Sequence, residues 1–223
     1  MMQNVSLRGH DIDIIRLLCY PLLAMKISPW AAAILACCMM GSFAISVVSA
    51  IEVEPQNQQV QAALQRGKAA AAARTPPDQL YAWFGSSKDL EPTGFLMTKM
   101  VGLAVMSTHF ALRGVTPSEP EVKQILDETT LLISVTIFGN RPDFARDSYM
   151  LLMQGTHTIK PVKVRFDGQA ARTAIWPNSP SYKAKVVASF NYAEIDPQAT
   201  AKLSVFPAGG GEITFELDFS RVD

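Results

Sequence analysis

Cysteine is absent from most of this chain of 223 residues. Its three cysteines, Cys19, Cys37 and Cys38, all lie before residue 39. From residue 51 onward the chain therefore has no disulfide, no cysteine nucleophile and no cysteine ligand for zinc. Its stability must come from a hydrophobic core, and residues 51–223 are numerous enough for one domain with such a core.

Charged side chains are absent from residues 28–51, a run rich in Ala, Ile, Val and Met. Lys26 precedes this run, and Glu52 and Glu54 follow it. An apolar segment of this length can cross a bilayer core of about 30 Å as a helix, or can be the hydrophobic part of a secretory signal. We therefore expect an extracytoplasmic protein, either periplasmic or secreted, or anchored in the membrane and facing the periplasm.

Three interpretations of this leader stay open. In the first, a signal peptide starts at Met25 and is cleaved after Ala50, because the residues at the last and third-last positions are small. In the second, residues 1–27 form a short cytoplasmic tail with basic residues, and residues 28–51 remain as a transmembrane helix. In the third, Cys37 ends a lipoprotein cleavage box and is acylated. A mis-assigned start codon would also account for residues 1–27.

Large apolar side chains are scarce in residues 52–79, where Ala, Gln and Pro dominate. Gln58 to Ala73 favours a helix, but such a helix has no apolar face and would be marginal alone. We expect an Ala/Gln/Pro-rich spacer here, which tethers a folded domain at residues 80–223 to the membrane. The alternative is a helix that packs against a partner.

Two segments of the domain before residue 130 differ in how clearly they can be interpreted. The apolar run from Lys99 to Leu112 has apolar residues on both alternating faces, and we interpret it as a buried strand. The segment after Thr116 has an N-cap residue, a proline and acidic residues at the positions that start a helix. It predicts one short helix from Pro117 to about Asp127.

From Leu131 onward apolar residues alternate with polar ones, which is typical of strands with one buried face. Tyr149 to Met153 and Thr158 to Phe166 are expected to form a pair of strands around a turn at Gly155. Six or seven such strands predict a mainly β fold, an antiparallel β-sandwich for which immunoglobulin-like topology is the leading interpretation. The residues expected to point inward are Leu131, Ile133, Val135, Ile137, Val162, Val164, Phe166, Ala184, Val186, Ala188, Phe190, Tyr192, Ala201, Leu203, Val205, Ile213, Phe215, Leu217 and Phe219.

Catalytic motifs are missing: the sequence has no G-x-S-x-G, no GxxxxGK[ST] and no GxGxxG. The only histidines after the leader are His109 and His157, and no ligand motif surrounds either. We expect His109 to be a packed or half-buried structural histidine and His157 to be an exposed turn residue, with no catalytic residue, no metal and no cofactor. The alternative is an envelope hydrolase, which would need a concave pocket that holds one of these histidines beside a carboxylate.

The segment Asn140 to Asp147 contains the carboxylate and amide oxygens that calcium prefers. Arg141 and Arg146 lie among these acids and would neutralise such a site. We therefore expect local turns and ion pairs here.

The loop from Ala174 to Tyr182 is the leading binding candidate. Prolines stiffen it, and Trp176, Asn178 and Tyr182 are the side chains that we expect to contact a ligand. The alternative is that Trp176 covers the open end of its own core.

Residues 51–223 contain 17 basic and 18 acidic residues, and this net charge of −1 argues against nucleic acid as a partner. Two groups of charge nevertheless occupy outward positions on the expected strands. If they lie on neighbouring strands they pair in a solvated ladder; if they lie on opposite sheets, the domain has a basic and an acidic surface suited to docking a partner. The basic group is Lys163, Arg165, Lys183 and Lys185, and the acidic group is Glu212, Glu216 and Asp218.

These features favour an exported, non-enzymatic β-sandwich module that binds a protein or a cell-envelope component. A membrane-tethered accessory subunit of a larger complex, held through residues 28–51, is a further alternative.

Overall fold

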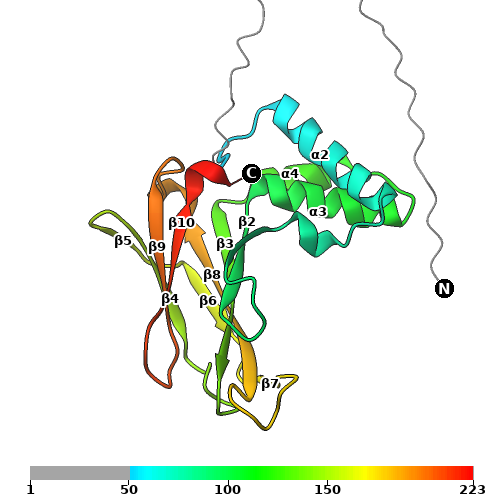
Figure 1. The fold of residues 1–223 in the computed structure, drawn as a ribbon. Coiled ribbons are helices and arrows are strands. Elements are labelled where there is room, and N and C mark those ends of the chain that lie inside the picture. Colours follow the sequence, from blue (N-terminus) through cyan, green and yellow to red (C-terminus); the bar gives the residue numbers. More distant parts are fainter. Residues whose placement is uncertain (1–50, 223) are drawn as a thin grey trace, which may run out of the picture. The chain divides into compact units, whose positions relative to one another are not determined.

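The computed structural model describes residues 51–222, which belong to a single compact unit (Figure 1). The expected leader, its cleavage site at Ala50 and the candidate lipidation site at Cys37 lie outside the described residues, apart from Ile51. Within the described range, no helix combines the length and the apolar character needed to cross a membrane.

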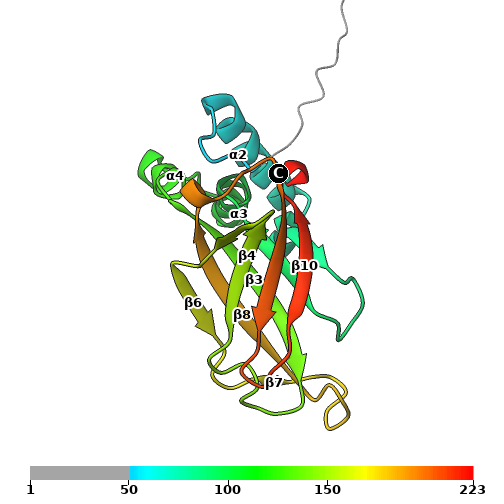
Figure 2. The same cartoon turned by 90° about the vertical axis from the view of Figure 1, so that its left-hand side faces the viewer.

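Two antiparallel sheets face each other, and three helices lie at one end (Figures 1 and 2). Sheet A has the order β1-β2-β3-β8-β6, with β7 also paired to β8, and sheet B has the order β10-β9-β4-β5. The prediction of a mainly β, antiparallel fold is confirmed. The strands are β1 (Ala82–Gly85), β2 (Thr93–Met97), β3 (Thr130–Gly139), β4 (Tyr149–Gln154), β5 (His157–Ile159), β6 (Lys163–Phe166), β7 (Ala171–Arg172), β8 (Tyr182–Asn191), β9 (Thr200–Phe206) and β10 (Ile213–Asp218). The helices are α2 (Asn57–Ala72), α3 (Lys99–Leu112) and α4 (Glu119–Leu126), with short 3-10 turns η1 (Pro77–Leu80), η2 (Tyr192–Glu194) and η3 (Phe219–Arg221).

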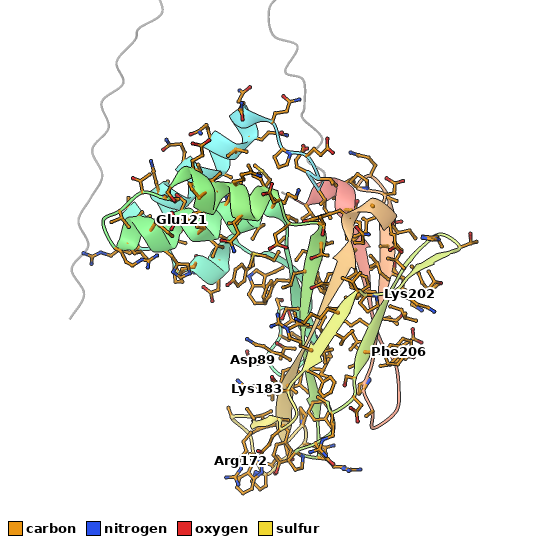
Figure 3. All side chains as sticks on the ribbon, turned by 180° about the vertical axis from the view of Figure 1, so that it is seen from behind. Asp89, Glu121, Arg172, Lys183, Lys202 and Phe206 are labelled. Atoms are coloured by element: carbon orange, nitrogen blue, oxygen red, sulfur yellow. The ribbon has the colours of Figure 1, made fainter. Side chains whose placement is uncertain are left out.

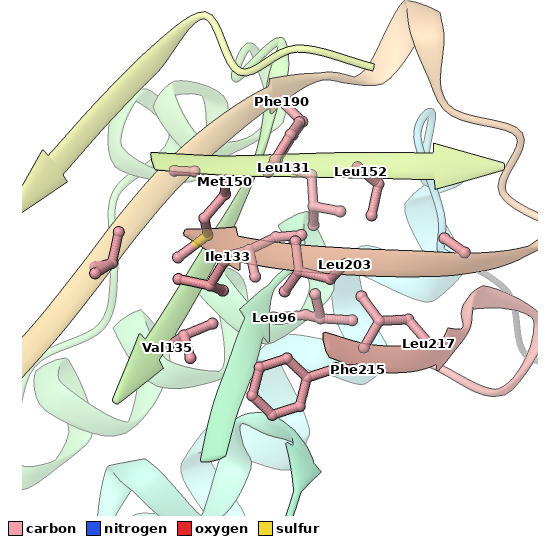
Figure 4. Packing of buried hydrophobic residues seen from close by; sticks show 14 of the residues in the cluster. Leu96, Leu131, Ile133, Val135, Met150, Leu152, Phe190, Leu203, Phe215 and Leu217 are labelled. Atoms are coloured by element: carbon pink, nitrogen blue, oxygen red, sulfur yellow. The ribbon is translucent and has the colours of Figure 1, made fainter. Parts of the chain in front are cut away.

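The inner faces of both sheets share one hydrophobic core (Figure 4). Ile133 of β3 and Leu203 of β9 are fully buried, and Phe215 and Leu217 of β10 close the same cluster. Burying a large apolar side chain of this kind contributes about 1.5–3 kcal/mol before the entropy of folding is subtracted. The alternation predicted for β3, β8, β9 and β10 is therefore the pattern that holds the two sheets together.

The single strand expected from Thr158 to Phe166 is divided between the two sheets. β5 pairs with β4 in sheet B, whereas β6 crosses over and pairs with β8 in sheet A. Pro161 lies between them and lacks the N–H that a continuing ladder needs. The inward positions predicted for Val162 and Phe166 were wrong, because these side chains are 61% and 37% exposed.

The run from Lys99 to Leu112 is helix α3, so the prediction of a strand was wrong. The Thr98 side chain caps it by accepting a hydrogen bond from the Val101 amide at 3.1 Å. The run is apolar on most sides because α3 packs against α2, against α4 and against the end of β2. A helix that is buried on several sides has apolar residues all around it, so its sequence lacks the 3.6-residue hydrophobic spacing by which a helix is recognised.

Residues 57–72 of the expected spacer form helix α2, which packs along α3 (Figure 1). The packing uses small residues: Ala63, Gly67 and Ala70 are buried. A Cβ atom at Gly67 would lie 2.2 Å from the carbonyl oxygen of Ala104, so the two helices are in close contact there. The stretch lacks large apolar residues because the two helices contact each other through small side chains, which let their backbones approach closely.

Helix α4 lies within the predicted range of Pro117 to Asp127, and the prediction is confirmed. Its start is a capping box in which the Ser118 amide donates to Glu121 Oε2 at 2.6 Å. Ser118 is therefore the N-cap.

Candidate functional site

The outer face of sheet A is the side of that sheet that points away from the core between the sheets. Side chains alternate along each strand, so residues paired in register across the sheet lie in one row on this face. One such row crosses the whole sheet and runs through Trp83, Phe95, Ser134, Val187 and Arg165. Its aromatic end lies on β1 and β2, and its basic end lies on β6.

The four cations of the basic group form a continuous stripe at the basic end of this face. Lys183 and Lys185 follow each other on one side of β8, and Lys163 and Arg165 do so on β6, each pair about 7 Å apart by strand geometry. Arg165 is paired with Val187 and is therefore a diagonal neighbour of Lys185. None of these four side chains makes an ion pair or a hydrogen bond within residues 51–222. We call these four residues the basic stripe.

The acidic group lies on the other sheet, as Figure 3 illustrates with Lys183 and Lys202 on opposite sides of the sandwich. Two of its three members have basic partners: Glu212 lies 3.3 Å from Lys202, and Asp218 lies 3.0 Å from Arg221. A hydrogen bond from Ser204, together with Lys202, holds the pKa of Glu212 below its usual range. The acidic surface is thus largely neutralised, whereas the basic stripe is not.

Three aromatic rings form a cluster at the opposite edge of the same outer face. The Tyr81 and Phe95 rings stack with centroids 4.3 Å apart, and Trp83 meets Phe95 edge-on at 5.4 Å. The Trp83 indole donates to the carbonyl oxygen of Asp78 at 2.8 Å, yet the residue remains 53% exposed. Phe84, next in sequence, points inward instead and packs against Phe215. Only the strand register shows that Phe95 completes this cluster.

Hydrogen bonds within the loop that precedes β8 stabilise its conformation. Thr173 Oγ1 donates to the Pro180 carbonyl oxygen at 2.7 Å, and Ser181 Oγ donates to that of Pro177 at 2.9 Å. Trp176 is 43% exposed, and the Arg172 guanidinium lies 4.1 Å from its ring centroid. Trp176 therefore does not cover the core.

The three candidate residues of this loop do not converge. Asn178 is exposed near Trp176, but Tyr182 is half-buried and packs against the core. Arg172, which sequence reasoning did not select, is the residue that accompanies Trp176 at the surface. Its stacking depends on the pairing of β7 with β8, which no local sequence signal indicates.

The histidines give no support to a catalytic centre. His109 is exposed on α3, so the expectation that it is packed or half-buried was wrong; the buried residues near it on the helix are Ser107 and Thr108. His157 is exposed at the start of β5, as expected. No group of three potential metal ligands from His, Cys, Asp and Glu occurs among residues 51–222.

The acidic loop after β3 forms a local ion pair of the expected kind. The Arg141 guanidinium donates to both carboxylate oxygens of Asp143, at 3.1 and 2.9 Å. These bonds hold the pKa of the Asp143 carboxyl below its usual range. The arginine thus occupies the oxygens that a cation would need.

Comparisons with known proteins give no family for this chain. No protein-family model and no curated protein matches it. Among solved structures, an IgNAR antibody domain C1 is similar to it at 12% sequence identity, over 46% of this chain and 84% of that domain, with a TM-score of 0.29.

Proposed function

We propose that this chain is a non-enzymatic binding module, delivered outside the cytoplasm by its leader, that docks a protein with an acidic surface on the outer face of sheet A. The observation that carries the proposal is the contrast between the two charged groups. The basic stripe is unpaired among the described residues, whereas two of the three acids on the other sheet have basic partners. A concentrated patch of one sign steers an oppositely charged partner and fixes how it docks.

The composition of this face favours a protein as the partner. Protein interfaces are enriched in aromatic residues and arginine, and a few such residues carry most of the binding energy. Trp83 supplies an exposed indole at one edge and Arg165 a guanidinium at the other, along one row. Arg172 and Trp176 place a second arginine and a second exposed indole at the loop that precedes β8.

The strand order supports an immunoglobulin-like topology for the sandwich. In immunoglobulin constant domains one sheet contains strands A, B, E and D and the other contains C, F and G. Reading β2 as A, β3 as B, β8 as E and β6 as D gives the order of sheet A, and β4, β9 and β10 then correspond to C, F and G. β5 continues sheet B beyond β4, and α3 and α4 are inserted between β2 and β3. This architecture exposes two broad sheet faces, one of which is the face that we propose for docking.

The extracytoplasmic location rests on residues 28–51 and is tested by the N-terminus of the protein isolated from its native host. We expect a mature chain that begins at Ile51, an acylated chain that begins at Cys37, or an unprocessed chain in the membrane fraction. An unprocessed chain in the cytosol would contradict the proposal.

Docking is tested by site-specific photocrosslinking of the full chain in its native host. A crosslinking residue at Val187, in the centre of the outer face of sheet A, should give a discrete protein adduct. The same residue at Leu151, on the outer face of sheet B, is the matched control and should not. An equal adduct from both positions, or an adduct with lipid or glycan in place of protein, would refute this partner.

Charge reversal then identifies the contribution of the basic stripe. Lys183→Glu with Lys185→Glu should abolish the adduct formed from position 187. Lys68→Glu with Arg74→Glu reverses two exposed cations on and just after α2 and should leave it intact. If both double variants lose the adduct equally, net charge and not the stripe is responsible.

A further inference from the structure

A cleft of about 410 Å³ lies where α3 and α4 meet the outer face of sheet A. Its floor includes Met97 and Leu132, which are paired in register on the outer face. Val105 and Met106 of α3 and Ile125 of α4 form its walls. The volume lies at the lower end of the range of small-molecule sites, which are concave and mostly apolar. We call this space the corner cleft, and Figure 1 shows the helices on this side of sheet A.

Two polar groups of the corner cleft are unusual for such apolar surroundings. Tyr192 is only 4% exposed. The backbone amide of Lys99 lies close enough to the buried hydroxyl oxygen to lower its pKa slightly, but the hydroxyl's own proton has no acceptor among residues 51–222. Lys99 Nζ lies 5.6 Å from the centroid of the Tyr192 ring and donates to the Leu126 carbonyl oxygen at 2.6 Å. That bond uses one of its three N–H groups. The cleft therefore contains an unused hydroxyl donor beside a cation.

The protonation state of Tyr192 suits it to donate. Burial raises the pKa of its phenol well above the ordinary value, so the hydroxyl keeps its proton at neutral pH. Glu128 also lines the cleft, but it is exposed. Its negative charge adds to the rise in the pKa of Tyr192, so a negative ligand group at the hydroxyl is placed on the side of the Lys99 ammonium and away from Glu128.

We propose that the corner cleft binds a small amphipathic molecule of the medium-chain carboxylate class. The carboxylate accepts hydrogen bonds from the Tyr192 hydroxyl and the Lys99 ammonium, and the alkyl body lies against Met97, Val105 and Ile125. Binding would satisfy a buried donor that is otherwise left without a partner, which makes the unoccupied state the costlier one. This site is separate from the docking of an acidic protein on the basic stripe.

The probe is a medium-chain carboxylic acid that carries a photoreactive diazirine, used on the purified full chain in phosphatidylcholine nanodiscs. Trypsin cuts after Lys99 and Arg113 and releases the peptide Met100 to Arg113, which contains the α3 wall. We expect the probe to label this peptide and unlabelled carboxylate to compete. Labelling that does not decrease with competitor would overturn the proposal.

Two variants test the two parts of the site. Gly102→Leu fills the cleft from α3, because even a Cβ atom there would lie 3.3 Å from Ile125 Cγ2; labelling of the peptide should be lost. His109→Leu adds the same side chain on an exposed position of α3 and should label as the unmodified chain does.

Tyr192→Phe keeps the shape of the cleft and removes the hydroxyl. The affinity for the carboxylate should fall about tenfold, while labelling by an alkyl diazirine that lacks the head group should not change. An unchanged carboxylate affinity in Tyr192→Phe, or undiminished labelling of Gly102→Leu, would overturn the proposal. Melting curves of each variant exclude loss of fold as the cause.

Discussion

The amide nitrogen of Ile51 donates a hydrogen bond to the carbonyl oxygen of Phe219 at 3.3 Å. Both side chains are buried in the core between the two sheets. Ile51 is the last residue of the uncharged run, so the end of that run is already part of the folded unit. The chain thus enters the domain beside the place where its last strand ends.

Ile51→Ala should lower the free energy of unfolding by about 2–4 kcal/mol, because it removes a fully packed side chain and leaves a cavity. Denaturant unfolding followed by tryptophan fluorescence measures the change. Val53→Ala, at a partly buried position, is the control and should cost less. Equal midpoints for Ile51→Ala and the unmodified chain would show that Ile51 is not part of the core.

Gly67→Ala should separate α2 from α3, because its Cβ would lie 2.2 Å from a backbone oxygen and 2.6 Å from Ser107 Cβ. We expect a loss of about 1–3 kcal/mol, typical of overpacking, although alanine favours an isolated helix. Gly168→Ala is the control, since nothing lies within 4 Å of a Cβ there. A more stable Gly67→Ala variant would mean that the two helices are not in contact.

The same helices show why sequence reasoning succeeded for the strands and failed here. Along β8 buried residues alternate with exposed or half-buried ones, and along β3 buried apolar residues alternate mostly with half-buried ones, so the alternation of residue types can be recognised in the sequence. α3 is covered on several sides and α2 is packed through glycine and alanine, so neither shows an apolar stripe. A hydrophobic period appears in the sequence where an element has one face in the core and one face in water. It is absent where an element is buried on several sides or packs through small residues.

The arrangement of the candidate site could not be predicted for a different reason, because it depends on which strands pair. The basic residues were visible in sequence, but their arrangement as a stripe required the pairing of β6 with β8. The division of Thr158 to Phe166 between two sheets decides that pairing, and Pro161 is its only local sign. The partners of Trp83 and Trp176, which are Phe95 and Arg172, likewise depend on strand register.

Trp176→Ala should change the free energy of unfolding by no more than about 0.5 kcal/mol, because the indole is 43% exposed and lies outside the core cluster. Phe190→Ala removes a fully buried ring and should cost about 3–5 kcal/mol. Thermal melts of the two variants give the comparison. A large loss of stability in Trp176→Ala would assign the loop a structural role and remove it from the binding candidates.

The stability of the domain should fall as the pH rises above about 10. Burial raises the pKa of Tyr192 in the folded state above its ordinary value of about 10. Above that pH the unfolded chain loses the phenol proton while the folded chain retains it, so unfolding becomes more favourable. Tyr192→Phe should reduce this fall, whereas Tyr149→Phe, at a residue 48% exposed, should not. Identical alkaline profiles for the two variants would contradict the burial of the Tyr192 hydroxyl.

Lys185→Glu should weaken binding of the partner and at the same time increase the stability of the fold. Lys185 lies between Lys183 along β8 and Arg165 diagonally on β6, so two cations repel the native residue and would attract a glutamate. The single Asp167 carboxylate, which accepts a hydrogen bond from the Lys185 amide at 2.8 Å, acts in the opposite direction and reduces the net effect. At low ionic strength the variant should be more stable by roughly 0.2–1 kcal/mol, and salt should remove the gain. Lys68→Glu makes the same change of charge on α2, away from the stripe, and should show no such salt-dependent gain. Melting curves at low and high salt, set beside the crosslinking yield from position 187, test both effects in one protein. A stabilised Lys185→Glu that no longer crosslinks would mean that the stripe is kept for its partner at the expense of the fold. A destabilised variant would instead mean that its cations are neutralised by groups within the chain.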